Sequence, residues 1–198
     1  MNRDEIARSL TGAWRLFLGR PDGMRFFDTS VDGFWRSFRA IILVAPLYGL
    51  TALADRQHLL TDADPADDLT NTQFWAAKAL TLGLDWVTLP IVLGLIAGFI
   101  GIRRGYPGYV VARNWATALM VIPFAAIALL DLLGLASPTV LVLPSLVALI
   151  ATFRMSFEIA RKALGVGFDV AAAFVVFDFL VSLAIVMTAN QLFGIDGW

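Results

Sequence analysis

The chain of 198 residues contains no cysteine, one histidine and only two lysines, Lys78 and Lys162. The lack of cysteine excludes disulfides, thiolate metal sites and cysteine nucleophiles, and also lipid anchors attached to cysteine. Charged residues make up only 16% of the chain, against about 25% in an average soluble domain. The net charge of -1 gives no reason to expect a nucleic acid partner.

Catalytic signatures are also missing from the sequence. It contains no H-E-x-x-H, G-x-S-x-G or G-x-x-x-x-G-K-[ST] pattern. The single histidine, His58, lies near Asp55, Asp62 and Asp64, and this group could bind a divalent cation weakly. A solvated acidic loop is the simpler interpretation. We therefore predict a protein that is not an enzyme and has no catalytic residue, metal or cofactor.

Apolar residues, in contrast, are abundant. They make up 59% of the chain, and the mean hydropathy is +0.75. A water-soluble fold of this size has too little interior to bury so much apolar surface, and intrinsic disorder requires low hydrophobicity. The composition predicts a multi-pass membrane protein.

Five apolar stretches are long enough to cross a hydrocarbon core of about 30 Å as helices, and none shows the two-residue alternation of a barrel strand. The predicted fold is an all-α membrane bundle over residues 34–193, followed by a short outer tail, 194–198. The expected spans are 34–54, 72–102, 114–135, 138–157 and 168–193. The first spans only if Arg36 and Arg39 extend to the interface. It is preceded by more residues than an ordinary signal peptide has, so we expect it to be retained.

The segment before the first span, residues 1–33, has an amphipathic pattern. Ile6, Leu10, Trp14 and Phe17 recur at intervals of three or four. This spacing predicts an amphipathic helix lying in the membrane interface, with Trp14 as an anchor. The alternative is a helix packed against the cytoplasmic side of its own bundle.

Basic residues predict the orientation. They cluster before the first span, between spans two and three, and between spans four and five, whereas the loop after span one is acidic. The positive-inside rule then places the N-terminus in the cytoplasm and the C-terminus outside. The excess of arginine over lysine, together with abundant alanine and glycine, is typical of high-GC bacteria. We therefore expect a bacterial inner membrane with a periplasmic C-terminus.

Two carboxylates lie deep in the predicted spans. Asp178 lies ten residues into span five and Asp85 thirteen residues into span two, and Lys78 precedes Asp85 by two helical turns. Ionisable groups inside a membrane are candidates for function. They could form a proton or cation path. The alternative, which the sequence favours, is a structural or gating role, with both carboxyls hydrogen-bonded to backbone or to nearby side chains such as Ser182.

A second candidate site is basic. The helical charge ladder around Glu158 is most simply a solvated extension of span four. The same residues could instead bind an anionic lipid headgroup. The candidates for contact with lipid headgroups or the interface are Trp14, Arg103, Arg104, Arg154, Arg161 and Lys162.

Small residues and prolines mark the helix surfaces. Gly94, Gly98 and Gly101 form a close-packing face at the end of span two, suited to bundle packing or to oligomer contacts. The first four spans each contain one proline, which tends to kink a helix. These are Pro46, Pro90, Pro123 and Pro144.

Two short motifs resemble the Yip-domain family, small five-span membrane proteins named for their interaction with Ypt/Rab GTPases. Asp32-Gly33-Phe34-Trp35 is similar to that family's acidic, glycine and aromatic entry motif, and Gly105-Tyr106-Pro107-Gly108-Tyr109 is similar to its glycine–tyrosine element. The resemblance implies a cytoplasmic N-terminal segment, five closely spaced helices and a non-enzymatic role in organising membranes or partners.

Two hypotheses about function follow. The first is a non-enzymatic membrane protein that acts as a scaffold, a membrane-organising factor or an accessory subunit, with a membrane-protein partner or a second copy of itself. The second is a small transporter or channel that uses Asp85 and Asp178.

Overall fold

The computed structural model describes residues 2–62 and 71–195, and within them it contains helices and no strand. The elements are α1 (Arg3–Phe17), η1 (Pro21–Phe26), α2 (Val31–Ser37), η2 (Phe38–Ala40), α3 (Ile41–Asp62), α4 (Asn71–Ile96), α5 (Tyr106–Leu132), α6 (Pro138–Leu164) and α7 (Phe168–Leu192).

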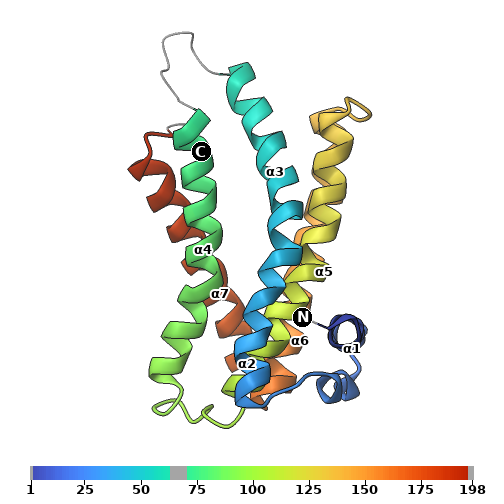
Figure 1. The fold of residues 1–198 in the computed structure, drawn as a ribbon, viewed down its shortest axis with the longest axis vertical. Helices are drawn as coiled ribbons and strands as arrows, with labels where there is room; N and C mark the ends of the chain where they lie inside the picture. The colour runs from blue at the N-terminus through green and yellow to red at the C-terminus, as the bar shows by residue number, and fades with distance from the viewer. Residues whose placement is uncertain (1, 63–70, 196–198) are drawn as a thin grey trace.

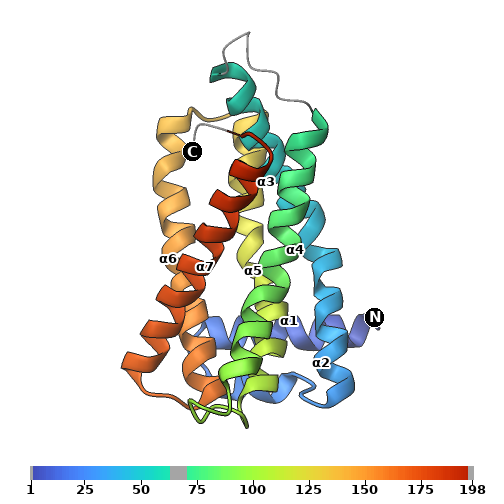
Figure 2. The ribbon, with the colours of Figure 1, turned by 90° about the vertical axis from the view of Figure 1, so that its left-hand side faces the viewer.

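Five helical segments are long and apolar enough to cross a membrane, which confirms the predicted all-α, five-span class. The first runs over Val31–Thr61, because α2, η2 and α3 follow one another without a break. The other four are α4 to α7. Figure 1 and Figure 2 show the five running up and down along the long axis of the molecule. The chain is thus a multi-pass membrane protein.

The ends of four spans differ from the predicted ones. The first continues past Ala54 to Thr61. The second helix ends at Ile96, before residue 102, and a turn containing Gly101 at φ 76° follows it. The third begins at Tyr106, eight residues before Asn114, so that Arg113 lies inside it. The fourth continues past Phe157 to Leu164, where Gly165 caps it with φ 66°. This last extension agrees with the predicted charge ladder.

The N-terminal helix α1 lies across one end of the bundle, roughly at right angles to the spans (Figures 1 and 2). It packs against α5 and α6. Ala13 and Leu16 of α1 are fully buried, whereas Trp14 stays 53% exposed. Gly12 is buried against η1, where a Cβ would lie 2.9 Å from the carbonyl oxygen of Gly23. The structure thus contains the packing that the alternative describes, with the half-exposed ring of Trp14 beside α5 and α6. The interfacial position of α1 stays a prediction.

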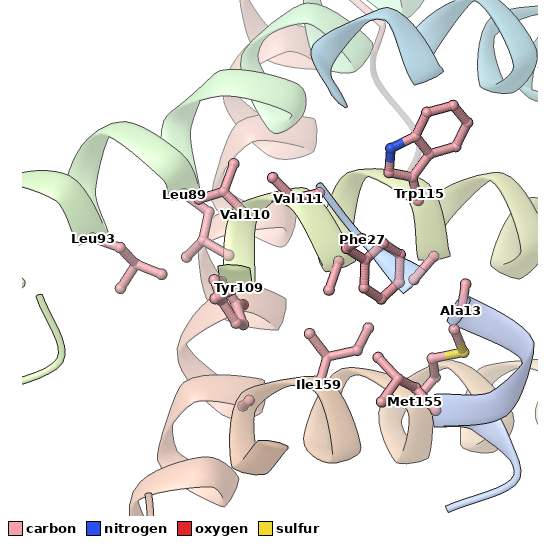
Figure 3. Close-up of a cluster of buried hydrophobic side chains, with 14 of the residues drawn as sticks. Ala13, Phe27, Leu89, Leu93, Tyr109, Val110, Val111, Trp115, Met155 and Ile159 are labelled. Atoms are coloured by element: carbon pink, nitrogen blue, oxygen red, sulfur yellow. The ribbon is translucent and has the colours of Figure 1, made fainter. Parts of the chain in front are cut away.

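Helix α5 is the centre of the packing. It contacts α3, α6, α1 and α2, and its first three turns contain most of its buried residues. The indole Nε1 of Trp86 on α4 donates to the carbonyl oxygen of Phe38 at 3.2 Å. Buried side chains from several helices meet α5 in one hydrophobic cluster (Figure 3). It includes Ala13, Phe27, Leu89, Leu93, Tyr109, Val110, Val111, Trp115, Met155 and Ile159.

Candidate functional site

The two deep carboxylates lie at a similar depth in the bundle. Asp178 is ten residues from the start of α7, or about 15 Å. Asp85 is eleven residues before the end of α4, or about 16 Å. Because α4 and α7 run in opposite directions and pack side by side, these two helix ends lie at the same end of the molecule (Figure 2). Asp85 and Asp178 can therefore contribute to one site.

A third charged residue, Arg113 on α5, joins them. Its Nη2 lies 3.1 Å from Oδ1 of Asp178 and donates a hydrogen bond to it, and it lies 3.9 Å from Oδ2 of Asp85. The sequence prediction placed Arg113 in the loop between spans two and three. That placement was wrong because a guanidinium paired with carboxylates can lie within a span, at a cost that the pairing reduces.

The two carboxylates have different surroundings. The hydroxyl of Ser182, one turn along α7 from Asp178, donates a hydrogen bond to Oδ1 of Asp85. Ser182 was one of the hydrogen-bond partners expected from the sequence. The side chain of Asp85 is 39% exposed, against 20% for Asp178 and 11% for Arg113. Asp178 is thus the closer partner of Arg113, and Asp85 is the more accessible carboxylate.

These residues line a cavity of about 240 Å³ between α4, α5, α6 and α7. Thr117, Thr152 and Ser156 add hydroxyl groups to its wall. The hydroxyls of Thr117 and Thr152 donate to carbonyl oxygens of their own helices, at 2.9 and 3.0 Å, which leaves their oxygen lone pairs as acceptors. The cavity therefore presents carboxylate and hydroxyl oxygens, which suit a proton, a cation or water.

The formal charge of the site is negative when both carboxylates are ionised, because one guanidinium faces two of them. A proton or a cation near Asp85 would balance this charge. No group of three or more His, Cys, Asp or Glu side chains that could hold a metal ion is found among residues 2–62 and 71–195.

Lys78 belongs to a different interaction. Its Nζ lies 2.6 Å from Oδ2 of Asp55 on α3 and 5.4 Å from the centre of the Phe74 ring. The sequence places Lys78 two helical turns before Asp85 on the same helix. The structure instead pairs Lys78 with Asp55 on the neighbouring helix α3. His58 likewise lies 2.6 Å from Asp131 of α5. The acidic loop residues Asp64, Asp67 and Asp68 lie outside the described part of the chain.

The basic residues predicted to meet lipid headgroups are found at the end of the bundle that carries α1 (Figures 1 and 2). Arg154 donates to the carbonyl oxygen of Phe17 at the end of α1 and lies over that residue's ring. Lys162 pairs with Glu158 at 2.6 Å, as the charge ladder predicted. Arg103 and Arg104 line a shallow hollow with Gly98 and Gly101. Arg154 therefore helps to hold α1 on the bundle.

Of the three glycines in the predicted close-packing face, only Gly94 makes a close contact within the chain. A Cβ atom at Gly94 would lie 3.0 Å from the hydroxyl oxygen of Tyr106, whose hydroxyl donates to the carbonyl oxygen of Pro90 at 2.8 Å. Gly94 thus permits a close approach of α4 and α5. At Gly98 and Gly101 a Cβ would meet nothing within 4 Å. These two glycines remain available for a contact outside the chain.

Comparisons of the chain with protein-family models, with curated proteins and with solved structures give no match.

Proposed function

We propose that this multi-pass membrane protein is a small transporter or channel that moves protons or small cations past Asp85 and Asp178. One observation carries the proposal, namely that Arg113 and the two carboxylates line an open cavity between α4, α5, α6 and α7. Charged side chains within membrane spans are costly, and those facing an internal cavity typically mark a pathway for ions or protons.

The difference between the carboxylates supports separate roles. Asp178 and Arg113 form a direct pair, which holds α5 and α7 together at mid-depth. Asp85 keeps the longer distance to Arg113 and the greater exposure, so it is the group that a passing cation or proton would meet. The prolines inside α4 and α5, Pro90 and Pro123, provide places where these helices could bend during transport.

The test is flux through the purified full-length protein in proteoliposomes. A pH-sensitive dye inside the vesicles would report protons, and encapsulated indicators would report Na⁺ and K⁺. We expect flux that falls at least tenfold in Asp85→Asn. Asp131→Asn is the matched control, because it also replaces one aspartate by asparagine. Asp131 lies about 27 Å from Arg113 along α5 and so is outside the site. Flux equal to that of empty vesicles, or flux unchanged in both Asp85→Asn and Asp178→Asn, would refute the proposal.

A scaffold or accessory subunit is the second candidate, and the open glycines Gly98 and Gly101 favour it. Both glycines lie in the turn after α4, so a partner would meet them at the end of the bundle and not along a helix face. This candidate agrees with the resemblance to the Yip-domain family and with a partner in the same membrane or a second copy of the chain. Crosslinking in native membranes, followed by identification of the linked proteins, would test it. Loss of one specific crosslinked product in Gly98→Leu would support it.

We also propose a bacterial inner membrane with the N-terminus in the cytoplasm and the C-terminus in the periplasm. The basic residues of the α4–α5 connection, Arg103 and Arg104, and of the last turn of α6, Arg161 and Lys162, support this orientation, since they lie at the end of the bundle that carries α1. In this orientation α1 lies at the cytoplasmic interface with Trp14 toward lipid.

A further inference from the structure

A second cavity adjoins the charged one. It measures about 250 Å³ and lies between α1, α5 and α6. Its wall is almost entirely apolar and includes Trp14 and Phe17 from α1, Pro123 from α5 and Ala151 from α6. The rings of Trp14 and Phe17 stack with their centres 5.4 Å apart at one side of it. The docked N-terminal helix therefore helps to form a pocket for an apolar group.

The two cavities share part of their walls. Met120 of α5 and Thr152 of α6 line both of them. Methionine is unbranched and flexible, so its side chain can adapt to a ligand. A ligand that displaces Met120 would extend from the carboxylates of Asp85 and Asp178 to the ring of Trp14. The two volumes together fall within the range of about 300–1,000 Å³ that is common for ligand pockets.

The charges determine which ligand suits this pair of cavities. Arg113 is held by Asp178, so it offers little to an anionic group, whereas Asp85 is the exposed carboxylate. The polar cavity therefore favours a positively charged head, and the second cavity favours an apolar tail. A neutral lipid chain would fit the apolar cavity alone and would gain nothing from Asp85.

We propose that the two adjoining cavities, opened to each other by a shift of Met120, bind an amphiphilic organic cation, with its charged nitrogen beside Asp85 and its hydrocarbon part against Trp14 and Ala151. This inference rests on the proposed role of Asp85 as the carboxylate that meets a cation, and it extends the small cations of the proposed function to a larger organic cation. It also assigns a role to α1, which completes the apolar end of the site.

Equilibrium binding tests the proposal separately from flux. The full-length protein in phosphatidylcholine nanodiscs is titrated with octyltrimethylammonium below its micelle concentration, and the heat of binding is measured. Octyl sulfate and octyl glucoside carry the same chain with an anionic and a neutral head. We expect octyltrimethylammonium to bind about tenfold more tightly than either, because its quaternary nitrogen, which has no N–H to donate, still attracts the Asp85 carboxylate through its charge in surroundings less polar than water.

Two variants test the polar and the apolar parts of the site separately. Asp85→Asn keeps the shape of the side chain, and we expect it to remove the preference for the cation. Ala151→Leu fills the apolar cavity. We expect it to weaken the binding of octyltrimethylammonium and to leave the binding of tetramethylammonium, which has no tail, unchanged. Asp131→Asn is the control for the loss of one carboxylate elsewhere. The thermal unfolding temperature of each variant establishes that it is folded.

Equal binding of all three octyl compounds would overturn the proposal and identify the apolar cavity as a lipid-chain site. Cation flux that depends on Asp85 without binding of octyltrimethylammonium would also overturn it, while leaving the proposed transport function in place. Binding that requires Asp85 in a protein with no flux of any cation would instead refute transport and retain the binding site.

Discussion

Arg113 on α5 and Asp178 on α7 form an ion pair inside the bundle, with 3.1 Å between Nη2 and Oδ1. The guanidinium is 11% exposed and the carboxylate 20%. Only one other acidic side chain, Asp85, lies within 4.0 Å of this guanidinium in the described residues. The pair links two helices that are far apart in the sequence, and it leaves one carboxylate of the site without a full countercharge.

Removing Arg113 should destabilise the protein strongly. In Arg113→Gln two carboxylates would face each other without a cation, and breaking a buried pair in this way typically costs about 3–5 kcal/mol. The thermal unfolding temperature in detergent micelles should fall clearly. Adding Asp178→Asn to Arg113→Gln should recover part of the loss, because the double variant has one fewer unpaired charge. Strictly additive losses in the double variant would contradict the pairing.

The sequence predicted the class of the fold and the two carboxylates, for simple physical reasons. Five long apolar runs need five helices in a bilayer, and a charge in such a run is conspicuous. Asp85 and Asp178 were therefore recognised without any knowledge of the packing. Their closeness to each other depends on α4 and α7 lying side by side, which hydropathy does not reveal.

Arg113 was not predicted as a site residue, because the spans were placed by hydropathy. Hydropathy favours starting a span after an arginine, so the predicted helix began at Asn114. A signal was nevertheless present, because Pro107 is suited to the first turn of a helix and the structure begins α5 at Tyr106. A helix that starts there contains Arg113 two turns inside. The partner of Arg113 could not be deduced, since it lies 65 residues away on another helix.

The docking of α1 should depend on the absence of a side chain at Gly12. A Cβ atom there would lie 2.7 Å from Cβ of Phe26 and 2.9 Å from the carbonyl oxygen of Gly23. Gly12→Ala should therefore push η1 away from α1, at a cost of about 1–3 kcal/mol. Hydrogen exchange of the α1 amides should become faster.

The matched control is Gly98→Ala, where a Cβ would meet nothing within 4 Å. This variant should exchange and unfold like the unmodified protein. If both variants behaved alike, the close crossing of α1 and η1 would not be what holds the N-terminal helix.

The lowered pKa of Asp28, which lies between η1 and α2, predicts that the stability of the fold depends on pH. Hydrogen bonds from the hydroxyl and backbone N–H of Ser30, with a smaller contribution from Arg36, lower the pKa of Asp28 below its ordinary value of 3.8. Since the folded-state pKa is the lower one, the carboxylate stabilises the fold above about pH 3.8, and that contribution is lost as the pH falls through the folded pKa.

Thermal unfolding of Asp28→Asn measured against pH tests this. At pH 7 the variant should unfold at a slightly lower temperature, because Asp28 is near solvent and its interactions are screened. The two proteins should converge as the pH falls through the lowered pKa of Asp28. A constant difference across the whole range would contradict the assignment of the lowered pKa to the folded state.

The orientation of the bundle can be measured directly because the chain contains no cysteine. Arg104→Cys places one thiol in the α4–α5 connection, and Ser137→Cys places one at the start of α6, at the opposite end. Both positions are exposed, and Ser137 makes no side-chain cap hydrogen bond that the change would remove. In spheroplasts a membrane-impermeant maleimide should label Ser137→Cys at once and Arg104→Cys only after permeabilisation. The reverse pattern would place the N-terminus outside, and it would show that the basic connections do not follow the positive-inside rule in this protein.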